Sequence, residues 1–120
     1  MFINLSNHDS ARWGNEQRMA AAQYGDIVDI PFPAVPPDGT AAEVVALAQN
    51  YINKIFQQLS NAKQPSAVHV MGEMTFTFMV VTRLKELGIK CIASTTERKT
   101  TYNPDGTKVS EFQFVKFREY

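Results

Sequence analysis

The chain has one cysteine, no long apolar run and no excess of charge, and each of these absences excludes a class of protein. Cys91 is the only cysteine in 120 residues, so no disulfide can form within the chain and a reducing compartment is expected. No apolar run approaches the length of a membrane span, and the residues after Met1 lack the basic start and the long apolar core of a signal peptide. We therefore predict a cytoplasmic protein that does not enter a membrane.

The charge balance argues against long nucleic acid as a partner. Twelve Lys and Arg residues balance twelve Asp and Glu residues, which gives a formal net charge of zero. Binding to long nucleic acid needs a basic surface for the phosphates. A small anionic ligand needs only a local positive site, so it stays compatible with this composition. The length fits one domain, residues 1–120, with a single core.

Several motifs of known chemistry are also missing. The chain has no GxGxxG fingerprint, no Walker loop and no GxSxG elbow, so a Ser-His-Asp hydrolase is poorly supported. The two histidines and the single cysteine lack the spacing of a metal site. We predict no structural metal and no cofactor.

Apolar segments alternate with helical patterns over residues 2–93. Strands are predicted at Phe2–Leu5, Ile27–Ile30, Ala67–Met71 and Ile89–Ala93. Helices are predicted at about Asn15–Tyr24, from a capping box at residues 40–43 to Leu59, and at Met74–Leu87. The prolines between positions 31 and 37 force an extended connector, because proline cannot continue a central strand.

The pattern changes in the C-terminal part of the chain. Arg98–Tyr102 and Lys108–Phe117 flank the turn sequence Asn103-Pro104-Asp105-Gly106, which predicts an antiparallel hairpin. The phenylalanines of the second segment do not keep one alternation, so a β-bulge or burial on both faces is expected.

The alternation of strands and helices predicts an α/β fold. We expect a Rossmann-like three-layer sandwich whose mainly parallel sheet, in the order 2-1-3-4, is covered on both faces. The C-terminal hairpin would extend the edge beside the fourth strand. In this order the winding reverses between the first and third strands, and ligands of open α/β sheets bind outside the carboxyl ends of the strands at such a point.

Three predicted strands end in small polar residues that would meet at this point. The strand-to-helix turn at Gly72-Glu73 is of a kind that presents backbone N–H groups to a ligand. Gly72 is equally compatible with a plain turn glycine, and Glu73 with a helix-start residue that favours the helix dipole. The expected ligand-binding residues are Ser6, Asn7, Gly72, Glu73, Met74, Thr75, Ser94, Thr95 and Thr96.

Charged and aromatic residues near these strand ends have both functional and structural interpretations. His8 follows the end of a strand and is either a base, a hydrogen-bond donor or a simple turn residue. Arg98 is the best-placed cation for a phosphate, or else a solvated hairpin residue. His69 lies inside an apolar strand and is expected to be a core histidine bonded to a neighbour. Trp13 is expected to pack the first helix or to stack on a base.

Parts of the chain resemble a known family. The segments Phe2–His8, Gly72-Glu73, Ser94–Arg98 and Phe114–Arg118 are similar to small CRISPR-associated accessory proteins of type III systems. These proteins resemble stand-alone Rossmann-like, CARF-related domains, some of which are ring nucleases. The resemblance implies a homodimer that binds a cyclic oligoadenylate across its two-fold axis. Some relatives cleave the ring and switch the defence signal off, and others only bind or sequester it.

The implied cleavage needs no metal, because the ring carries its own nucleophile, the ribose 2′-hydroxyl. A protein can hold this oxygen in line with the adjacent phosphorus and stabilise the developing charge, which yields a 2′,3′-cyclic phosphate. His8 and Arg98 are the catalytic residues expected from their positions, the first for proton transfer and the second for the phosphate oxygens. Two alternatives stay open. One is a non-catalytic nucleotide-binding or sequestering module, and the other is an interaction subunit whose exposed hairpin edge recruits another chain.

Overall fold

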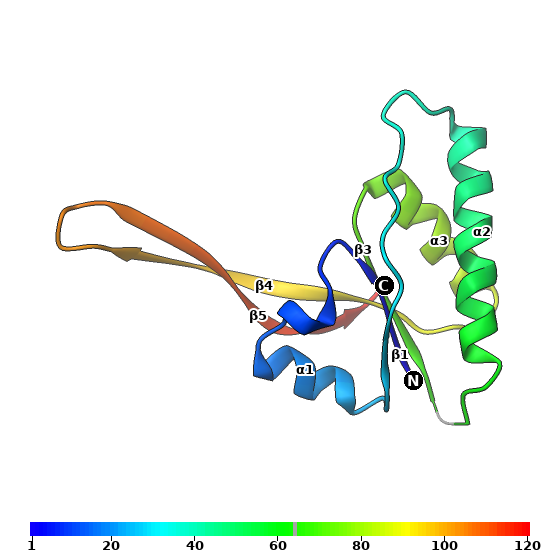
Figure 1. Ribbon diagram of the computed structural model, residues 1–120, viewed down its shortest axis with the longest axis horizontal. Coiled ribbons are helices and arrows are strands. Elements are labelled where there is room, and N and C mark those ends of the chain that lie inside the picture. Colours follow the sequence, from blue (N-terminus) through cyan, green and yellow to red (C-terminus); the bar gives the residue numbers. More distant parts are fainter. Residues whose placement is uncertain (64) are drawn as a thin grey trace.

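The computed structural model, which describes residues 1–63 and 65–120, contains one five-stranded sheet with helices on both of its faces (Figure 1). The strands are β1 (Phe2–Ser6), β2 (Ile27–Asp29), β3 (Ala67–Met71), β4 (Cys91–Tyr102) and β5 (Lys108–Glu119). The helices are α1 (Asn15–Ala22), α2 (Ala41–Leu59) and α3 (Met74–Glu86), and a 3₁₀ turn, η1, spans Ser10–Arg12.

The sheet is mainly parallel and ends in an antiparallel pair, as predicted. β1 pairs in parallel with β2 and β3, β3 pairs in parallel with β4, and β4 pairs antiparallel with β5. The strand order is β2-β1-β3-β4-β5 rather than 2-1-3-4, because the last strand of the hairpin joins the sheet beside β4. The carboxyl ends of β1 and β3 are therefore neighbours.

The predicted boundary between the sheet and the hairpin is wrong. Ile89–Ala93 and Arg98–Tyr102 were expected to be separate segments, but β4 runs unbroken from Cys91 to Tyr102. β5 pairs along it from Ile92 to Tyr102 and supplies ladder hydrogen bonds over the polar middle of the strand. The threonines of this polar stretch favour extended backbone, so the strand continues past the point where its side chains leave the core.

The expected irregularity in the second hairpin strand is a β-bulge. Thr95 pairs with Lys116 and Thr96 pairs with Phe114, so Val115 is an extra residue in β5. A bulge of one residue changes which side chains share a face of the sheet. Phe114 and Phe117 consequently lie on the same face, with ring centroids 4.9 Å apart.

Both faces of the central strands are buried, each against a different helical layer. Alternate residues of a strand point to opposite faces, so Ile3 and Leu5 pack against α2 and α3, whereas Phe2 packs on the side of α1. Figure 1 shows α1 on one side of the sheet and the α2–α3 pair on the other. The strands β1 and β3 are buried almost throughout because both of their faces are covered.

The capping signal before α2 is confirmed. The side chain of Thr40 accepts a hydrogen bond from the backbone N–H of Glu43 at 3.1 Å, and the helix begins at Ala41. α1 and α3 end slightly earlier than predicted, at Ala22 and Glu86. None of the helices in the described part of the chain is long and apolar enough to span a membrane.

Beyond the bulge, β4 and β5 leave the core as a long two-stranded arm, defined here as residues 96–115. Figure 1 shows it projecting away from the helices, and the molecule measures 52 × 39 × 21 Å along its principal axes. Tyr102 near the tip and Phe112 near the base are 73% and 71% exposed. The base of the arm stands beside the carboxyl ends of the parallel strands.

Gly72 is required by a close approach rather than by an unusual backbone angle. A Cβ at this position would lie 2.2 Å from the Cζ atom of Phe32, whose ring also packs edge-on against Phe76 with centroids 5.1 Å apart. Phe32 belongs to the proline-rich connector, so the connector and the turn after β3 leave no room for a side chain.

We predict that Gly72→Ala lowers the free energy of unfolding by about 1–3 kcal/mol, because the added methyl group forces the Phe32 ring to move. Urea unfolding followed by circular dichroism measures this loss. Adding Phe32→Ala should remove most of the extra penalty, since the stability effects of substitutions at residues in contact are not additive. Equal penalties for Gly72→Ala with and without the Phe32 ring would contradict the steric explanation.

Candidate functional site

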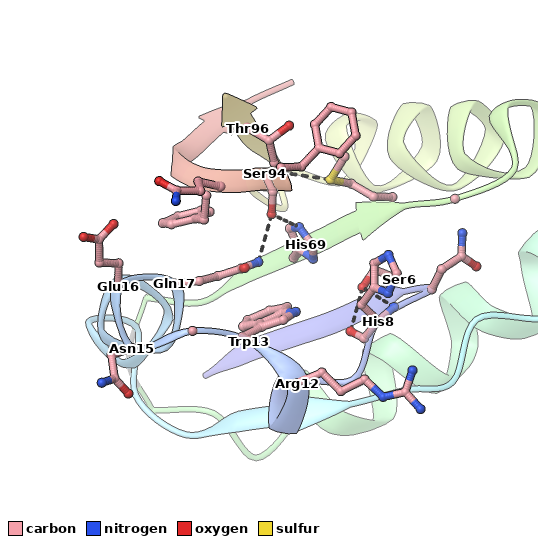
Figure 2. Close-up of a pocket in the computed structure, with 17 residues that line it drawn as sticks. Ser6, His8, Arg12, Trp13, Asn15, Glu16, Gln17, His69, Ser94 and Thr96 are labelled. Atoms are coloured by element: carbon pink, nitrogen blue, oxygen red, sulfur yellow. Dashed lines mark hydrogen bonds between the residues drawn. The ribbon is translucent and has the colours of Figure 1, made fainter. Parts of the chain in front are cut away.

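A cleft of about 870 Å³ opens at the carboxyl ends of β1 and β3, between the segment from η1 to α1 and the base of the arm (Figure 2). Its volume lies within the range of about 300–1,000 Å³ that is usual for ligand sites. The position is the one predicted for a ligand in an open α/β sheet. The predicted residues that line this cleft are Ser6, Asn7, His8, Gly72, Ser94 and Thr96.

The remaining predicted residues lie elsewhere, and those at the start of α3 have structural partners. The Glu73 carboxylate accepts hydrogen bonds from the backbone N–H groups of Phe76 and Thr75, at 2.8 and 3.0 Å, and from the Thr75 hydroxyl. These bonds, the one from Phe76 first, lower the pKa of Glu73. Glu73 is thus the N-cap of α3, which matches its interpretation as a helix-start residue. Met74 is 84% exposed beside a different groove.

Thr95 and Arg98 point to other partners on the hairpin. The Thr95 hydroxyl donates to the backbone oxygen of Lys116 at 3.0 Å, at the bulge. The guanidinium of Arg98 donates to the Ser110 hydroxyl at 3.4 Å on the arm. Neither residue belongs to the described lining of the cleft. The cleft's own arginine is Arg12, at the end of η1, which the sequence analysis did not single out.

Aromatic side chains form walls of the cleft. Trp13 packs edge-on against His69 and Phe2, with ring centroids 5.4 and 5.8 Å apart, and also lines the cavity. Phe112 and Phe114 line it from the base of the arm. Trp13 therefore packs against rings of the sheet, on the face where α1 lies, rather than mainly against the helix itself. The bulge in β5 brings the arm's phenylalanines to the same cleft.

The polar residues at the floor of the cleft belong to a chain of hydrogen bonds that continues inside the sheet. His69 is only 2% exposed, and its Nε2 atom lies 2.7 Å from the Ser94 hydroxyl. Its Nδ1 atom lies 2.9 Å from Oδ1 of Asn4, which also accepts a hydrogen bond from the Ser6 hydroxyl at 2.7 Å. The amide of Gln17 donates to the Ser94 hydroxyl at 3.1 Å, and Figure 2 shows these two side chains converging with His69.

The partners of Asn4 decide which His69 nitrogen carries the proton. The Asn4 amide nitrogen donates to Oδ1 of Asp29 and to the backbone oxygen of His8, both at 2.8 Å. The amide oxygen must then face His69, so Nδ1 of the imidazole donates to it. In the neutral ring Nε2 is left as an acceptor, and the Ser94 hydroxyl donates to it.

Burial and hydrogen bonding set the charges of this chain. Burial lowers the pKa of His69 from 6.5 to about 4, so the imidazole is neutral at neutral pH. Burial raises the pKa of Asp29, but hydrogen bonds from Asn4 and Ser10 outweigh it and leave the pKa below its usual value. The chain thus ends in a carboxylate at the β2 side and in a neutral hydroxyl at the cleft.

The prediction that His69 is a core histidine bonded to a neighbour is confirmed, but its partners were missed. Asn4 pairs with both Asp29 and His69 in the strand register, so the three side chains lie at one level of the sheet. The available signal was a polar residue at the third position of two otherwise largely apolar strands, Asn4 in the first and His69 in the third. Within the described residues, no three His, Cys, Asp or Glu side chains gather as a metal site requires.

A second, more apolar groove of about 490 Å³ adjoins the cleft. The two share Met71 and Gly72, and α3 contributes Met74 and Phe78, of which Phe78 is 70% exposed. Large exposed apolar side chains that lie together beside a cleft are typical of an interaction surface.

Fold and site together define an α/β protein with a cleft at the carboxyl ends of its parallel strands. A family model described as the uncharacterized protein MJ1673 family matches residues 1–118, and the chain belongs to this family. No curated protein and no solved structure matches the chain.

We predict that acid destabilises the protein through His69. The unfolded chain takes up a proton on this imidazole near pH 6.5, whereas the folded protein resists it until about pH 4. The unfolded state therefore binds more protons in this range, and the free energy of unfolding falls as the pH is lowered. At about 1.36 kcal/mol for each pH unit, the loss approaches about 3 kcal/mol.

Urea unfolding between about pH 7 and about pH 4.5 measures this loss. His69→Gln is expected to be less stable at neutral pH, because the chain of hydrogen bonds is broken, but to lose less stability on acidification. The lowered pKa of Asp29 adds its own loss only as the pH falls through that lowered value. A slope that is the same in wild type and His69→Gln would show that another group causes the acid sensitivity.

Proposed function

We propose that the protein binds a cyclic oligoadenylate in this cleft and cleaves it without a metal, as part of a Rossmann-like regulator of type III CRISPR signalling. The observation that supports binding is the combination of aromatic walls with an uncharged, hydrogen-bonding floor at the carboxyl ends of β1 and β3. Single-stranded nucleotides are bound in this way, with bases stacked on aromatic rings and backbones held by polar and cationic groups.

The cleft offers partners for each part of an adenylate. Phe112 presents an exposed ring on which an adenine can stack. The side-chain amide of Asn7 lines the same space, and amides pair well with the N6 and N7 atoms of adenine. Arg12, rather than the expected Arg98, is the arginine that lines the cleft, so we assign the phosphate contact to it.

A homodimer follows from the size of this ligand. A ring of several adenylates is larger than the drug-sized molecules that fill one such cleft. Two clefts related by a two-fold axis would hold the two halves of a symmetric ring. The exposed Met74 and Phe78 lie at the groove that adjoins the cleft, where a second copy would cover them.

Isothermal titration of the protein with cyclic tri-, tetra- and hexa-adenylate, and with a linear oligoadenylate, tests binding. We expect one ring size to bind, and Phe112→Ala to weaken it by about 1–3 kcal/mol because one stacked base is lost. Tyr102→Ala is the matched control, since Tyr102 is an equally exposed aromatic residue of the same arm outside the described cleft. Arg12→Ala should weaken binding more than Arg98→Ala.

The titration and a cleavage assay on a radiolabelled ring together separate the alternatives. Binding without cleavage of the radiolabelled ring, with or without chelator, would support the sequestering module. If no ring binds at any concentration tested, the proposed function is wrong and an interaction subunit becomes the better interpretation.

The dimer is tested by light scattering at micromolar protein, with and without the ring that binds. We expect the mass of two chains, and we expect Phe78→Asp to shift it toward one chain because a charge would be buried against the partner. A wild-type protein that stays monomeric in both conditions would contradict the dimer and leave ring binding by a single cleft to be explained.

A further inference from the structure

The Ser94 hydroxyl is the cleft end of a chain of hydrogen bonds that crosses four neighbouring strands. It lies on β4, His69 on β3, Asn4 on β1 and Asp29 on β2, which is the order of the strands in the sheet. The successive distances are 2.7 Å from Ser94 to His69, 2.9 Å from His69 to Asn4 and 2.8 Å from Asn4 to Asp29. A hydroxyl bonded to an imidazole that a third group orients is the arrangement that activates oxygens in enzymes.

Every donor in this chain points in a defined direction. Asp29 accepts from the Asn4 amide nitrogen, the Asn4 oxygen accepts from Nδ1 of His69, and Nε2 therefore accepts from Ser94. A hydroxyl oxygen has two acceptor lone pairs, and the Gln17 amide occupies one of them at 3.1 Å. The second is available to a donor from the cleft, which Ser94 lines.

We propose that Ser94 is the catalytic residue that takes the proton of a ribose 2′-hydroxyl in the bound ring while it passes its own proton to His69. Asn4 is a positioning residue, because it holds the imidazole with Nε2 toward the cleft. This inference rests on the proposed binding of a cyclic oligoadenylate and assigns a residue to its cleavage.

The step balances without a co-reactant other than water. The 2′-oxygen forms a bond to the adjacent phosphorus as the bond from phosphorus to the 5′-oxygen breaks. The 2′-proton moves to the Ser94 oxygen, and the Ser94 proton moves to Nε2 of His69. The leaving 5′-oxygen takes a proton from water in the open cleft. The hydroxide that remains takes a proton from the Ser94 hydroxyl, which takes back the proton from Nε2 of His69. The products are a 2′,3′-cyclic phosphate and a 5′-hydroxyl.

The location of Ser94 favours this role over a purely structural one. A network that only joined the strands would not need its last hydroxyl to line a cleft beside Trp13 and Thr96. His69 is neutral at neutral pH, so its Nε2 atom carries no proton and accepts from the Ser94 hydroxyl. Burial also makes the imidazole a weaker base than an exposed histidine, so it holds the proton only transiently. His8, the base expected from sequence, lies in the same cleft, so the two assignments can be compared in one assay.

Single-turnover cleavage of a radiolabelled ring, with the dissociation constant measured separately, tests the proposal. We expect Ser94→Ala to slow cleavage by about 10²–10⁴-fold while the dissociation constant stays nearly unchanged. Ser94→Thr keeps a hydroxyl and suits a strand, so it should restore most of the rate. Thr100→Ala removes a hydroxyl of the same strand on the exposed arm and is the matched control.

Two further readouts distinguish a proton relay from a loss of structure. The single-turnover rate should show a solvent deuterium isotope effect that Ser94→Ala loses. Thermal unfolding of both Ser94 variants checks that they fold. If Ser94→Ala does not fold, Ser94→Val carries the test, because valine has the shape of threonine without its hydroxyl and suits a strand. Asn4→Leu removes the acceptor for Nδ1 and should slow cleavage at comparable binding. The exchange of Asn4→Asp with Asp29→Asn keeps that acceptor and leaves one donor between positions 4 and 29, so it should retain more activity than Asn4→Leu.

Three results would overturn the relay. The first is a Ser94→Ala protein that cleaves as fast as wild type. The second is a Ser94→Ala protein that is slowed no more than the Thr100→Ala control, while His8→Ala loses most of its cleavage rate. The third is a wild-type protein that binds the ring and never cleaves it, which would overturn the relay but leave the binding half of the proposed function intact. A wild-type protein that binds no ring would instead overturn the proposed function itself.

Discussion

The cleft at the carboxyl ends of the parallel strands depends on one neutral histidine, which is held between an amide and a hydroxyl. His69 lies where an unpaired polar group would be costly, and it is tolerated because both of its ring nitrogens have partners. Asn4 extends the bonds to Asp29, so β2, β1, β3 and β4 are joined at one level by side chains as well as by their backbones. A fully bonded buried network of this kind gives the cleft a rigid floor with defined donors and acceptors.

A second constraint, the bulge at Val115, couples the arm to this floor. Without the extra residue, Phe114 and Phe117 would lie on opposite faces of β5. With it, Phe117 packs near Phe2 in the core, and Phe114 and Phe112 line the cleft. The arm is therefore more than an edge of the sheet, because its base completes an aromatic wall for the site.

The turn after β3 shows how a structural role can resemble a functional one. Gly72 is a glycine because the ring of Phe32 occupies the place of a side chain, and Glu73 is acidic because it caps α3. Both residues stand beside the cleft, yet their identities follow from packing and capping. The side chains whose identities packing alone explains less well are Ser94 and Arg12, which face the cleft.

Local patterns in the sequence determined much of the fold of this protein. Alternation of apolar and helical segments predicted the parallel sheet, the cap at Thr40 predicted the start of α2, and Asn103–Gly106 predicted the hairpin, because these signals act over a few residues. The same pattern predicted that a cleft would lie at the strand ends and that His69 would lie in the core. Only the tertiary structure decided that β4 is continuous, that Arg12 rather than Arg98 lines the cleft, and that His69 bonds to Asn4 and Ser94. These features depend on strand register and on contacts between residues far apart in the chain, which local periodicity does not encode.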